Sequence, residues 1–272
     1  MPAPTWHQAN VAFADWSLAE TSALTHLVPL LRAAEENGDL TNWFHIRKRP
    51  CWRIRYQTAE GRHDPIAPAL EALEAEGHIN GWVAVIYEPE VHAFGGPEGM
   101  DVAHRLFHRD SRSLADHLLE EDDRRREMSL LLCSLLMRSA GLDWYEQGDV
   151  WARVSEHRGQ PETGGSSRLR AAVRRLISVD AQDMLRAGGE LARFSDWASA
   201  YTAAGSELTR LATAGGLHRG LRDVVAHHVL FAWNRTGLAQ NDQAALAAAA
   251  KTVIFGPDPT TERSPQDRAY SV

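Results

Sequence analysis

The first 90 residues alternate between the two periods that distinguish strands from helices. Apolar residues recur at every second position in 52–56, the second half of the segment 43–56, and more weakly in 6–13, which is typical of strands with one packed face. Apolar residues spaced three and four apart predict helices over 19–36 and 66–76. The run 81–87 is apolar almost throughout, so we expect it to be a central strand of the sheet.

Helical periodicity dominates the chain beyond residue 100. The apolar spacing and the glycine and proline positions predict helices over 100–107, 111–119, 122–140, 169–177, 178–186, 190–213, 217–233 and 240–253. A small N-terminal sheet followed by a helical majority predicts an α+β fold. No clear linker interrupts residues 1–256, so we expect one domain there. The aperiodic residues 257–272 are predicted to be a disordered tail.

Two arginines in the 43–56 segment, after a break at Pro50, are the first candidates for chemistry. The apolar residues of this predicted strand point to one side, and Arg53 and Arg55 point to the other. Residues two apart on one face of a strand lie about 6–7 Å apart, and a guanidinium stays charged at any biological pH. The pair therefore suits an anion or a row of carbonyl oxygens, whereas the basic residues 47–49 are interpreted as solvated charge.

Two further segments are candidates for a binding site, namely residues 88–99 and the predicted helix that contains His228. Residues 88–99 contain three glycines and two prolines, which predicts a loop leaving the end of a strand, a common place for a binding site. Further along, His228, Phe231 and Arg235 fall on one stripe of a predicted helix, with Asn234 beside them. These groups suit the holding or protonation of a carbonyl, and a core helix with a polar C-terminal cap explains them equally well.

Composition and charge narrow the classes of function. The 272 residues carry a net charge of -7, which argues against nucleic acid as the main partner, because phosphate binding needs clustered positive charge. Cys51 and Cys133 form neither a disulfide framework nor a metal-ligand spacing. No signal peptide is visible, and no apolar stretch reaches the ~18–20 residues that span a bilayer. We therefore expect a cytoplasmic protein without a membrane partner.

Familiar catalytic signatures are missing from the sequence. His104 and His108 lie four apart, but no carboxylate accompanies them in a recognised metal spacing, so we expect no metal. There is no Gly-x-Ser-x-Gly elbow, phosphate loop or dinucleotide fingerprint. Most of the nine tryptophans are expected in the core, and a few are free to wall a pocket for a peptide or a heterocycle.

Six short motifs together carry a resemblance to a known family. In chain order they are Pro50–Tyr56, Tyr87–Glu90, Phe94–Met100, Leu106–Ser111, Gly148–Val154 and Leu230–Leu238. They resemble the thiopeptide-type bacteriocin biosynthesis family, which is similar to the C-terminal elimination domain of lantibiotic dehydratases. The resemblance runs from about residue 6 to residue 256, and its specificity lies in the order of the motifs rather than in any single one.

The resemblance implies maturation of a ribosomally made peptide by one of two reactions, neither needing a metal or redox cofactor. One removes glutamate from glutamylated serine or threonine. The other joins two dehydroalanines in a formal aza-cycloaddition and then loses water and the leader peptide, which gives a pyridine. Eliminating relatives carry an arginine at the position of Pro89 and a histidine at that of Ala232. Because elimination needs a base and a charge partner, we expect the pyridine-forming reaction, with elimination as the alternative.

The patterns and the resemblance together assign an expected site. The expected catalytic residues are Arg53, Arg55, Tyr87 and His228, and the expected substrate-binding residues are Trp52, Glu88, Phe94, Trp233, Asn234 and Arg235. The expected partners are a modified precursor peptide with its leader and a glutamylating dehydratase. A homodimer is neither required nor excluded. No cofactor is expected. The remaining interpretation is a non-catalytic peptide-binding subunit of a dehydratase complex.

Overall fold

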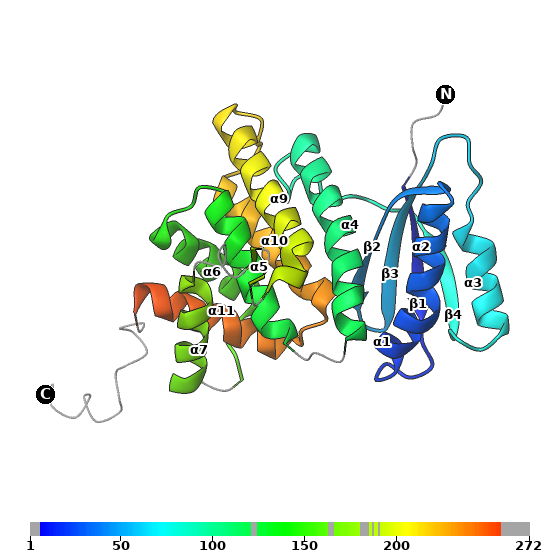
Figure 1. The fold of residues 1–272 in the computed structure, drawn as a ribbon, viewed down its shortest axis with the longest axis horizontal. Helices are drawn as coiled ribbons and strands as arrows, with labels where there is room; N and C mark the ends of the chain where they lie inside the picture. Colours follow the sequence, from blue (N-terminus) through cyan, green and yellow to red (C-terminus); the bar gives the residue numbers. More distant parts are fainter. Residues whose placement is uncertain are drawn as a thin grey trace, which may run out of the picture.

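The chain folds into an antiparallel sheet at one end and a set of packed helices at the other (Figure 1). The computed structural model describes residues 6–120, 124–162, 166–179, 185–186, 188–189 and 191–256. This arrangement confirms the predicted α+β class. The predicted tail and most of the predicted helix over 178–186 lie outside the described residues.

The sheet has four strands in the order β2-β3-β1-β4. Their bounds are β1 Trp6–Ala12, β2 Leu40–Lys48, β3 Cys51–Thr58 and β4 Gly81–Val85. β2 and β3 form a hairpin with a cis peptide bond before Pro50, at the predicted break. Cross-strand rows on one side of the sheet contain Ile46, Arg53, Asn10 and Val83, and then Phe44, Arg55, Gln8 and Val85. We call this side the arginine face and the opposite side the core face.

Helices from the N-terminal half of the chain cover the core face. They are α1 Ala19–Ser22, the π-helical turn η1 Ala23–Leu27, α2 Val28–Glu36 and α3 Ile66–Ala75. Asp64 fixes the start of α3, because its Oδ1 accepts the amide of Ile66 at 2.8 Å. Side chains of β3, among them Trp52 and Ile54, pack against these helices in one apolar core. The two predicted N-terminal helices are thus confirmed.

The helical part begins with one long helix, α4 Pro97–Leu119. The sequence predicted two helices here, because polar residues near position 110 resemble a break. Asp110 is instead buried and accepts a hydrogen bond from Trp197 Nε1 at 2.7 Å, so the helix continues. The other described helices are α5 Arg125–Ser139, α6 Trp144–Arg158, α7 Ser167–Ser178, η2 Ala192–Phe194, α9 Ser195–Thr213, α10 Leu221–Thr236 and α11 Gln240–Phe255.

Most of these helices match the expected ranges, and α6 is an addition that the sequence patterns did not indicate. Its start is a capping box, in which Asp143 accepts the amide of Glu146 at 2.8 Å and Glu146 accepts the amide of Asp143 at 3.0 Å. Within the described ranges, no helix combines the length and the apolar character that crossing a membrane requires.

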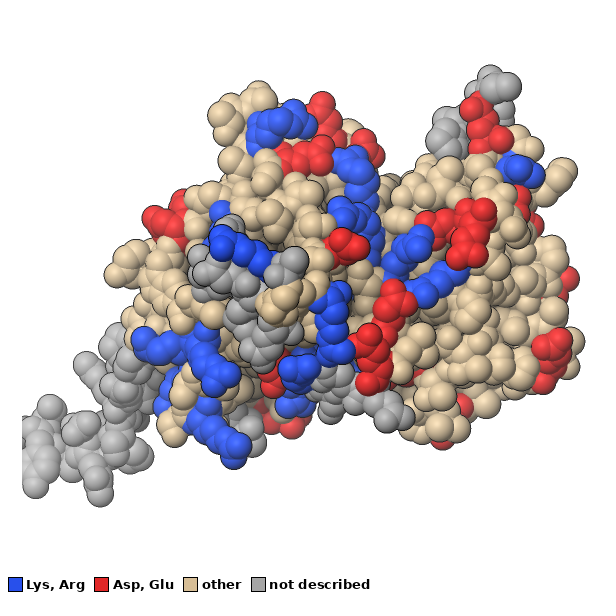
Figure 2. Space-filling model, viewed as in Figure 1, with Lys and Arg blue, Asp and Glu red and all other residues tan. Residues whose placement is uncertain are grey.

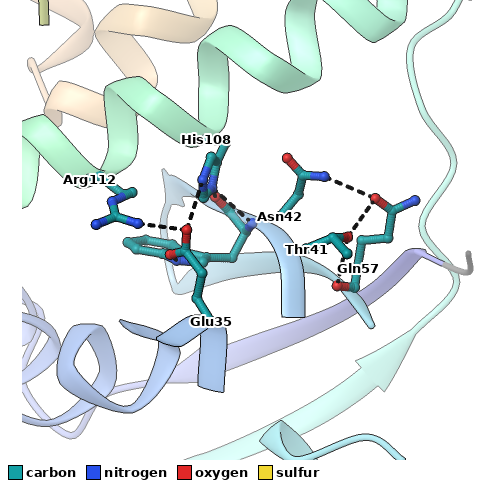
Figure 3. A network of polar contacts seen from close by, with 7 residues as sticks. Glu35, Thr41, Asn42, Gln57, His108 and Arg112 are labelled. Carbon is teal, nitrogen blue, oxygen red and sulfur yellow. Dashed lines mark hydrogen bonds and ion pairs between the residues drawn. The ribbon is translucent and has the colours of Figure 1, made fainter. Parts of the chain in front are cut away.

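β2 is an edge strand that is closed by neighbouring helices. Figure 3 shows Glu35 of α2 beside His108 of α4 at this edge. The backbone N–H of His45 donates to Ser111 Oγ at 3.3 Å, and His108 Nδ1 lies 3.0 Å from the carbonyl oxygen of Trp43. Glu35 also accepts from Trp43 Nε1 at 2.8 Å. This edge is therefore held by side chains of α2 and α4.

β4 lies at the other edge, so the prediction of a central strand at 81–87 is wrong. The apolar run resembles a strand covered on both faces. However, Val83 is 61% exposed, and Ile86, which follows β4, is 89% exposed. Trp82 packs against the core under the opposite face. A central position in the sheet therefore does not explain why residues 81–87 are apolar.

Candidate functional site

The arginine face brings the two arginines of β3 beside amide side chains of β1. Asn10 is the cross-strand neighbour of Arg53, and Gln8 is the neighbour of Arg55. The two amides are linked, since Gln8 Nε2 donates to Asn10 Oδ1 at 2.9 Å. Two guanidinium groups and two carboxamides thus share one side of the sheet, and their N–H groups are suited to carbonyl or carboxylate oxygens.

Arg55 is held rigidly although it carries a full charge and is only 4% exposed. Its Nε donates to Gln8 Oε1 at 2.8 Å, and its Nη2 lies 3.5 Å from Glu90 Oε1. The guanidinium stacks 4.5 Å from the ring centroid of Tyr87 and 5.5 Å from that of Phe44. Its Nη1 is buried and has no hydrogen-bond partner among the described residues. An unpaired buried N–H is costly, so this group is suited to an oxygen of a bound molecule.

Tyr87 and His104 form a buried proton-carrying pair beside Arg55. The Tyr87 hydroxyl lies 2.8 Å from His104 Nε2, and Trp6 stacks on the imidazole at 4.4 Å between centroids. Burial raises the pKa of Tyr87. Burial, with Arg55 as a second cause, lowers the pKa of His104 to about 4. At neutral pH the imidazole is therefore uncharged and the phenol keeps its proton, and the two groups share one hydrogen bond.

Arg53 differs from Arg55 although the two lie on the same face. Its side chain is half-buried, and in the part of the chain that the structure describes its guanidinium makes no hydrogen bond or ion pair. Its cross-strand row ends in Ile46 and Val83, which are apolar and offer no acceptor. Arg53 is thus available for an oxygen of a ligand, whereas Arg55 is fixed in place by its neighbours.

His228 and Phe94 lie in an aromatic layer behind this site. His228 is 1% exposed, its Nδ1 lies 2.9 Å from the carbonyl oxygen of Val224, and its ring meets Phe94 edge to face at 4.9 Å. Burial lowers the pKa of His228 to about 4. The ring of Phe107 lies 6.2 Å from His228 and 5.2 Å from Phe44. The structure therefore separates this histidine from the arginine pair by aromatic rings.

Arg235 and Trp233 belong to the helical core. Both are fully buried. Arg235 Nε donates to Asp110, which also accepts from Trp197 Nε1 at 2.7 Å and from the hydroxyl of Tyr201 at 2.8 Å. These bonds link α4, α9 and α10. They fix Arg235 through its Nε, while its Nη1 and Nη2 are buried without a hydrogen-bond partner among the described residues. No hydrogen bond or ion pair between described residues joins Arg235 or Trp233 to the arginine pair, so we leave both out of the site.

Three other expected substrate contacts also lie apart from the arginine pair. Asn234 Oδ1 accepts from Arg158 Nη2 at 3.1 Å, between α10 and α6. Trp52 lies on the core face, where it is 1% exposed and stacks on His45 at 4.8 Å. Glu88 is exposed on the loop after β4. Of the residues expected from the sequence, the structure brings together Arg53, Arg55 and Tyr87.

A separate hollow of ≈ 400 Å³ lies between α4 and the start of α9. Figure 2 shows basic and acidic residues mixed along the seam between the sheet and the helices on this side. Of the charges that line the hollow, Arg112 pairs with Glu35 at 2.6 Å and Arg193 with Glu120 at 2.8 Å. Paired surface charges of this kind are common solvated structure. Among the described residues no group of three His, Cys, Asp or Glu side chains suits a metal ion.

Comparison with protein families identifies the group to which the fold belongs. The model of the family described as "Lantibiotic biosynthesis dehydratase C-term" matches residues 6–254. The chain belongs to the lantibiotic dehydratase C-terminal family. No curated protein matches the sequence.

Three solved structures share the fold of this lantibiotic dehydratase C-terminal chain. MibB, a tRNA-dependent lantibiotic dehydratase from Microbispora sp. 107891, has a TM-score of 0.62 and 17% identity over 94% of this chain and 29% of MibB. TsrL has a TM-score of 0.60 and 15% identity over 94% and 99% of the two chains. TbtD, the pyridine synthase from thiomuracin biosynthesis, has a TM-score of 0.52 and 14% identity over 92% and 99%. At these identities the likeness shows the fold, and the chain spans 29% of the length of MibB.

The two departures from the eliminating members of the family have clear places in the structure. Pro89 is exposed on the loop after β4, and the next residue, Glu90, is the charge partner of Arg55. Ala232 is 1% exposed inside α10, where its methyl group packs in the helical core. Neither position supplies a cation or an imidazole to this chain.

Sequence reasoning missed four residues of the site, namely Gln8, Asn10, Glu90 and His104. Gln8 and Asn10 are the polar members of an alternating strand, so a prediction of the strand order would have placed them beside the arginines. His104 lies on the buried stripe of α4, and the sequence analysis weighed it only as a metal ligand with His108. Glu90 ends the motif Tyr87–Glu90, but no local pattern shows its approach to Arg55, which depends on the path of the loop.

Proposed function

We propose that this chain is a peptide-maturing enzyme that builds a six-membered nitrogen heterocycle from a dehydrated precursor peptide. The reaction is the formal aza-cycloaddition of two dehydroalanines, followed by loss of water and release of the leader peptide as its carboxamide. Membership of the lantibiotic dehydratase C-terminal family and a fold shared with the pyridine synthase TbtD support the proposal.

This reaction depends on alignment more than on a strong base. Holding two reacting groups about 3–3.5 Å apart in the correct orientation can supply about 7–11 kcal/mol of the barrier. We assign Arg53 and Arg55 to peptide carbonyl oxygens, including the amide that tautomerises before ring closure. Fixed donors aimed at an oxygen that gains negative charge each accelerate a reaction by about 10²–10³-fold. Arg55 is fixed in this way by Gln8 and Glu90.

Tyr87 is the residue to which we assign proton transfer. Its hydroxyl lies 2.8 Å from His104, and its ring lies under the guanidinium of Arg55. Because burial raises the pKa of Tyr87, the phenol keeps its proton at neutral pH. It can then donate to the departing hydroxyl or carboxamide, and the phenolate takes back the proton that the ring loses as it becomes aromatic.

The observation that carries the proposal is the set of groups around the arginines. In the described part of the chain, neither guanidinium makes a hydrogen bond to an imidazole, and the nearby His104 is engaged by the Tyr87 hydroxyl. His228 lies behind Phe107, and position 232 is alanine. The nearby carboxylate, Glu90, is engaged by Arg55. The face is thus rich in hydrogen-bond donors and aromatic surface, which suits orientation of a peptide more than removal of its α proton.

The test is a turnover assay read by mass spectrometry. The substrates are candidate precursor peptides sought in the gene neighbourhood and converted beforehand to their dehydrated form. The proposal predicts two products in equal amounts, the leader peptide carboxamide and a core peptide lighter by the leader and one water. An intact precursor after prolonged incubation with folded enzyme contradicts the proposal.

Glutamate elimination is the second candidate, and one observation favours it. Two guanidinium groups on the same face suit the carboxylates of a departing glutamate. The same assay distinguishes the two reactions if a glutamylated precursor is also supplied. Elimination predicts loss of glutamate from a chain that otherwise stays intact, with no release of the leader.

A further inference from the structure

The two edge strands of the sheet differ in the contacts that their outer backbone makes with the rest of the molecule. At β2, side chains of α4 approach the outward-facing backbone, as with the N–H of His45 and Ser111 Oγ. At β4, no hydrogen bond joins residues 81–86 to any described residue beyond the ladder with β1. With respect to the described residues, the outer backbone of β4 therefore presents unpaired N–H and C=O groups.

The composition of β4 makes this open edge unusual. Residues 81–87 contain no charged side chain and no proline, although proteins commonly protect a free edge with lysine, proline or a covering segment. Two of the large exposed apolar side chains lie there, Val83 at 61% and Ile86 at 89% exposed. An open apolar edge that lacks such protection is the form expected of a strand that receives a partner strand.

The position of β4 relative to the arginine face indicates which partner. Val83 and Val85 continue the cross-strand rows that contain Arg53 and Arg55, with one strand between. A strand added outside β4 lies three strand spacings from β3, about 14 Å. Four or five extended residues span that distance. A peptide paired with β4 can therefore reach the arginines with the residues that follow the paired segment.

The length of β4 argues against a second copy of this chain as the occupant. The strand has 5 residues, whereas a stable protein–protein interface involves about 20–30 residues on each side. An extended peptide needs only such a short edge, because main-chain hydrogen bonds supply the affinity and alternate side chains the specificity.

We propose that the outer edge of β4 binds an extended segment of the precursor peptide as a fifth strand. The inference rests on the proposed function for the identity of the peptide. In this arrangement Val83 contacts side chains of the bound segment on the arginine face, and Ile86 contacts the end of the segment nearest Tyr87. The reacting residues lie a few positions away along the same peptide.

Amide hydrogen exchange on the full chain tests the proposal directly. The probe is the unmodified precursor peptide, so the result does not depend on turnover. Bound precursor is expected to slow exchange at alternate amides within 81–86, because successive N–H groups of a strand point to opposite edges. Binding that leaves these amides unchanged overturns the proposal. Protection that appears without peptide and grows with protein concentration also overturns it, because the occupant is then a second copy.

Matched variants separate the edge from general apolar contact. The double variant Val83→Lys with Ile86→Lys adds charge to exposed positions, so we expect an unchanged melting temperature and at least ~10-fold weaker precursor binding. Leu119→Lys alters a side chain that is 57% exposed at the end of α4 and is expected to bind as wild type. Equal affinity of the double variant and wild type contradicts the proposal. Weak binding with normal turnover at saturating peptide supports it independently of the reaction assigned above.

Discussion

The two faces of β3 differ in role, because one packs in the apolar core and the other carries the residues of the candidate site. Trp52, Ile54 and Tyr56 are 1–3% exposed and pack under α1 to α3. Arg53 and Arg55, the residues between them, face amides, a tyrosine and the open side of the sheet. Because side chains alternate strictly, neighbours in sequence belong to different environments. Substitutions one residue apart are therefore expected to affect different properties.

Trp52→Ala is expected to have the largest effect, and that effect concerns stability. Removing a fully buried aromatic side chain costs about 3–5 kcal/mol, through lost burial and the cavity left behind. Urea unfolding measures this loss. The fraction that remains folded is expected to keep wild-type affinity for the precursor peptide. Wild-type stability combined with lost affinity would place Trp52 in the site and not in the core.

Arg55→Gln is expected to reduce leader release by about 10²–10³-fold, because it removes a fixed donor. Arg55→Lys keeps the charge but loses the planar fork, so we expect only partial recovery. Turnover by mass spectrometry at saturating precursor gives the effect, with circular dichroism to confirm the fold. Full activity of Arg55→Gln contradicts the role assigned to this face.

The pH dependence of stability tests the buried histidines on the two faces of the sheet. Burial lowers the pKa of His45, on the core face, to about 3 and that of His104, beside Tyr87, to about 4. Both folded values lie below the unfolded value of about 6.5, so the unfolded chain binds more protons. The free energy of unfolding is expected to fall as the pH drops from about 6.5 toward 4, by up to ~1.4 kcal/mol per pKa unit of each shift. His104→Gln is expected to flatten the decline. An identical slope in wild type and variant argues against a buried neutral His104.

Of these substitutions, Arg53→Gln is expected to have the smallest effect, and the effect is expected on leader release and not on stability. Arg53 has no partner among the described residues, so the change in stability is expected to stay within about 0.5 kcal/mol. Leader release is expected to fall by about 10-fold, which corresponds to ~1.4 kcal/mol of transition-state stabilisation. Arg168→Gln on α7 is the control, because Arg168 is exposed and also lacks an ion pair among the described residues. Equal losses in both variants contradict a specific role for Arg53.

The local period of the sequence sufficed for much of the fold. The alternation around Arg53 identified the faces of β3 correctly, and Pro50 marked the hairpin. The apolar run at 81–87 led to the wrong prediction of a central strand, because an uncharged edge strand and a central strand have the same local composition. The sequence patterns also predicted two helices in place of α4, because nothing local shows that Asp110 bonds to Trp197 and Tyr201, which lie 87 and 91 residues away.

The same limit applies to the candidate site. Arg53, Arg55 and Tyr87 were found because each lies on or just beyond a strand whose pattern is plain. His228 matched a plausible stripe, but helix packing buries it behind Phe107. Glu90 reaches Arg55 through a loop whose course no pattern predicts. Residues that act through long-range packing required the structure.

The most direct test of the account compares leader release by Arg53→Gln and Trp52→Phe under conditions in which both variants are fully folded. The two positions are adjacent in β3 and differ in the face that they occupy. The account predicts a clear loss of leader carboxamide with Arg53→Gln and near wild-type release with Trp52→Phe. Normal release by Arg53→Gln, or a comparable loss in both variants, would contradict the assignment of the reaction to the arginine face.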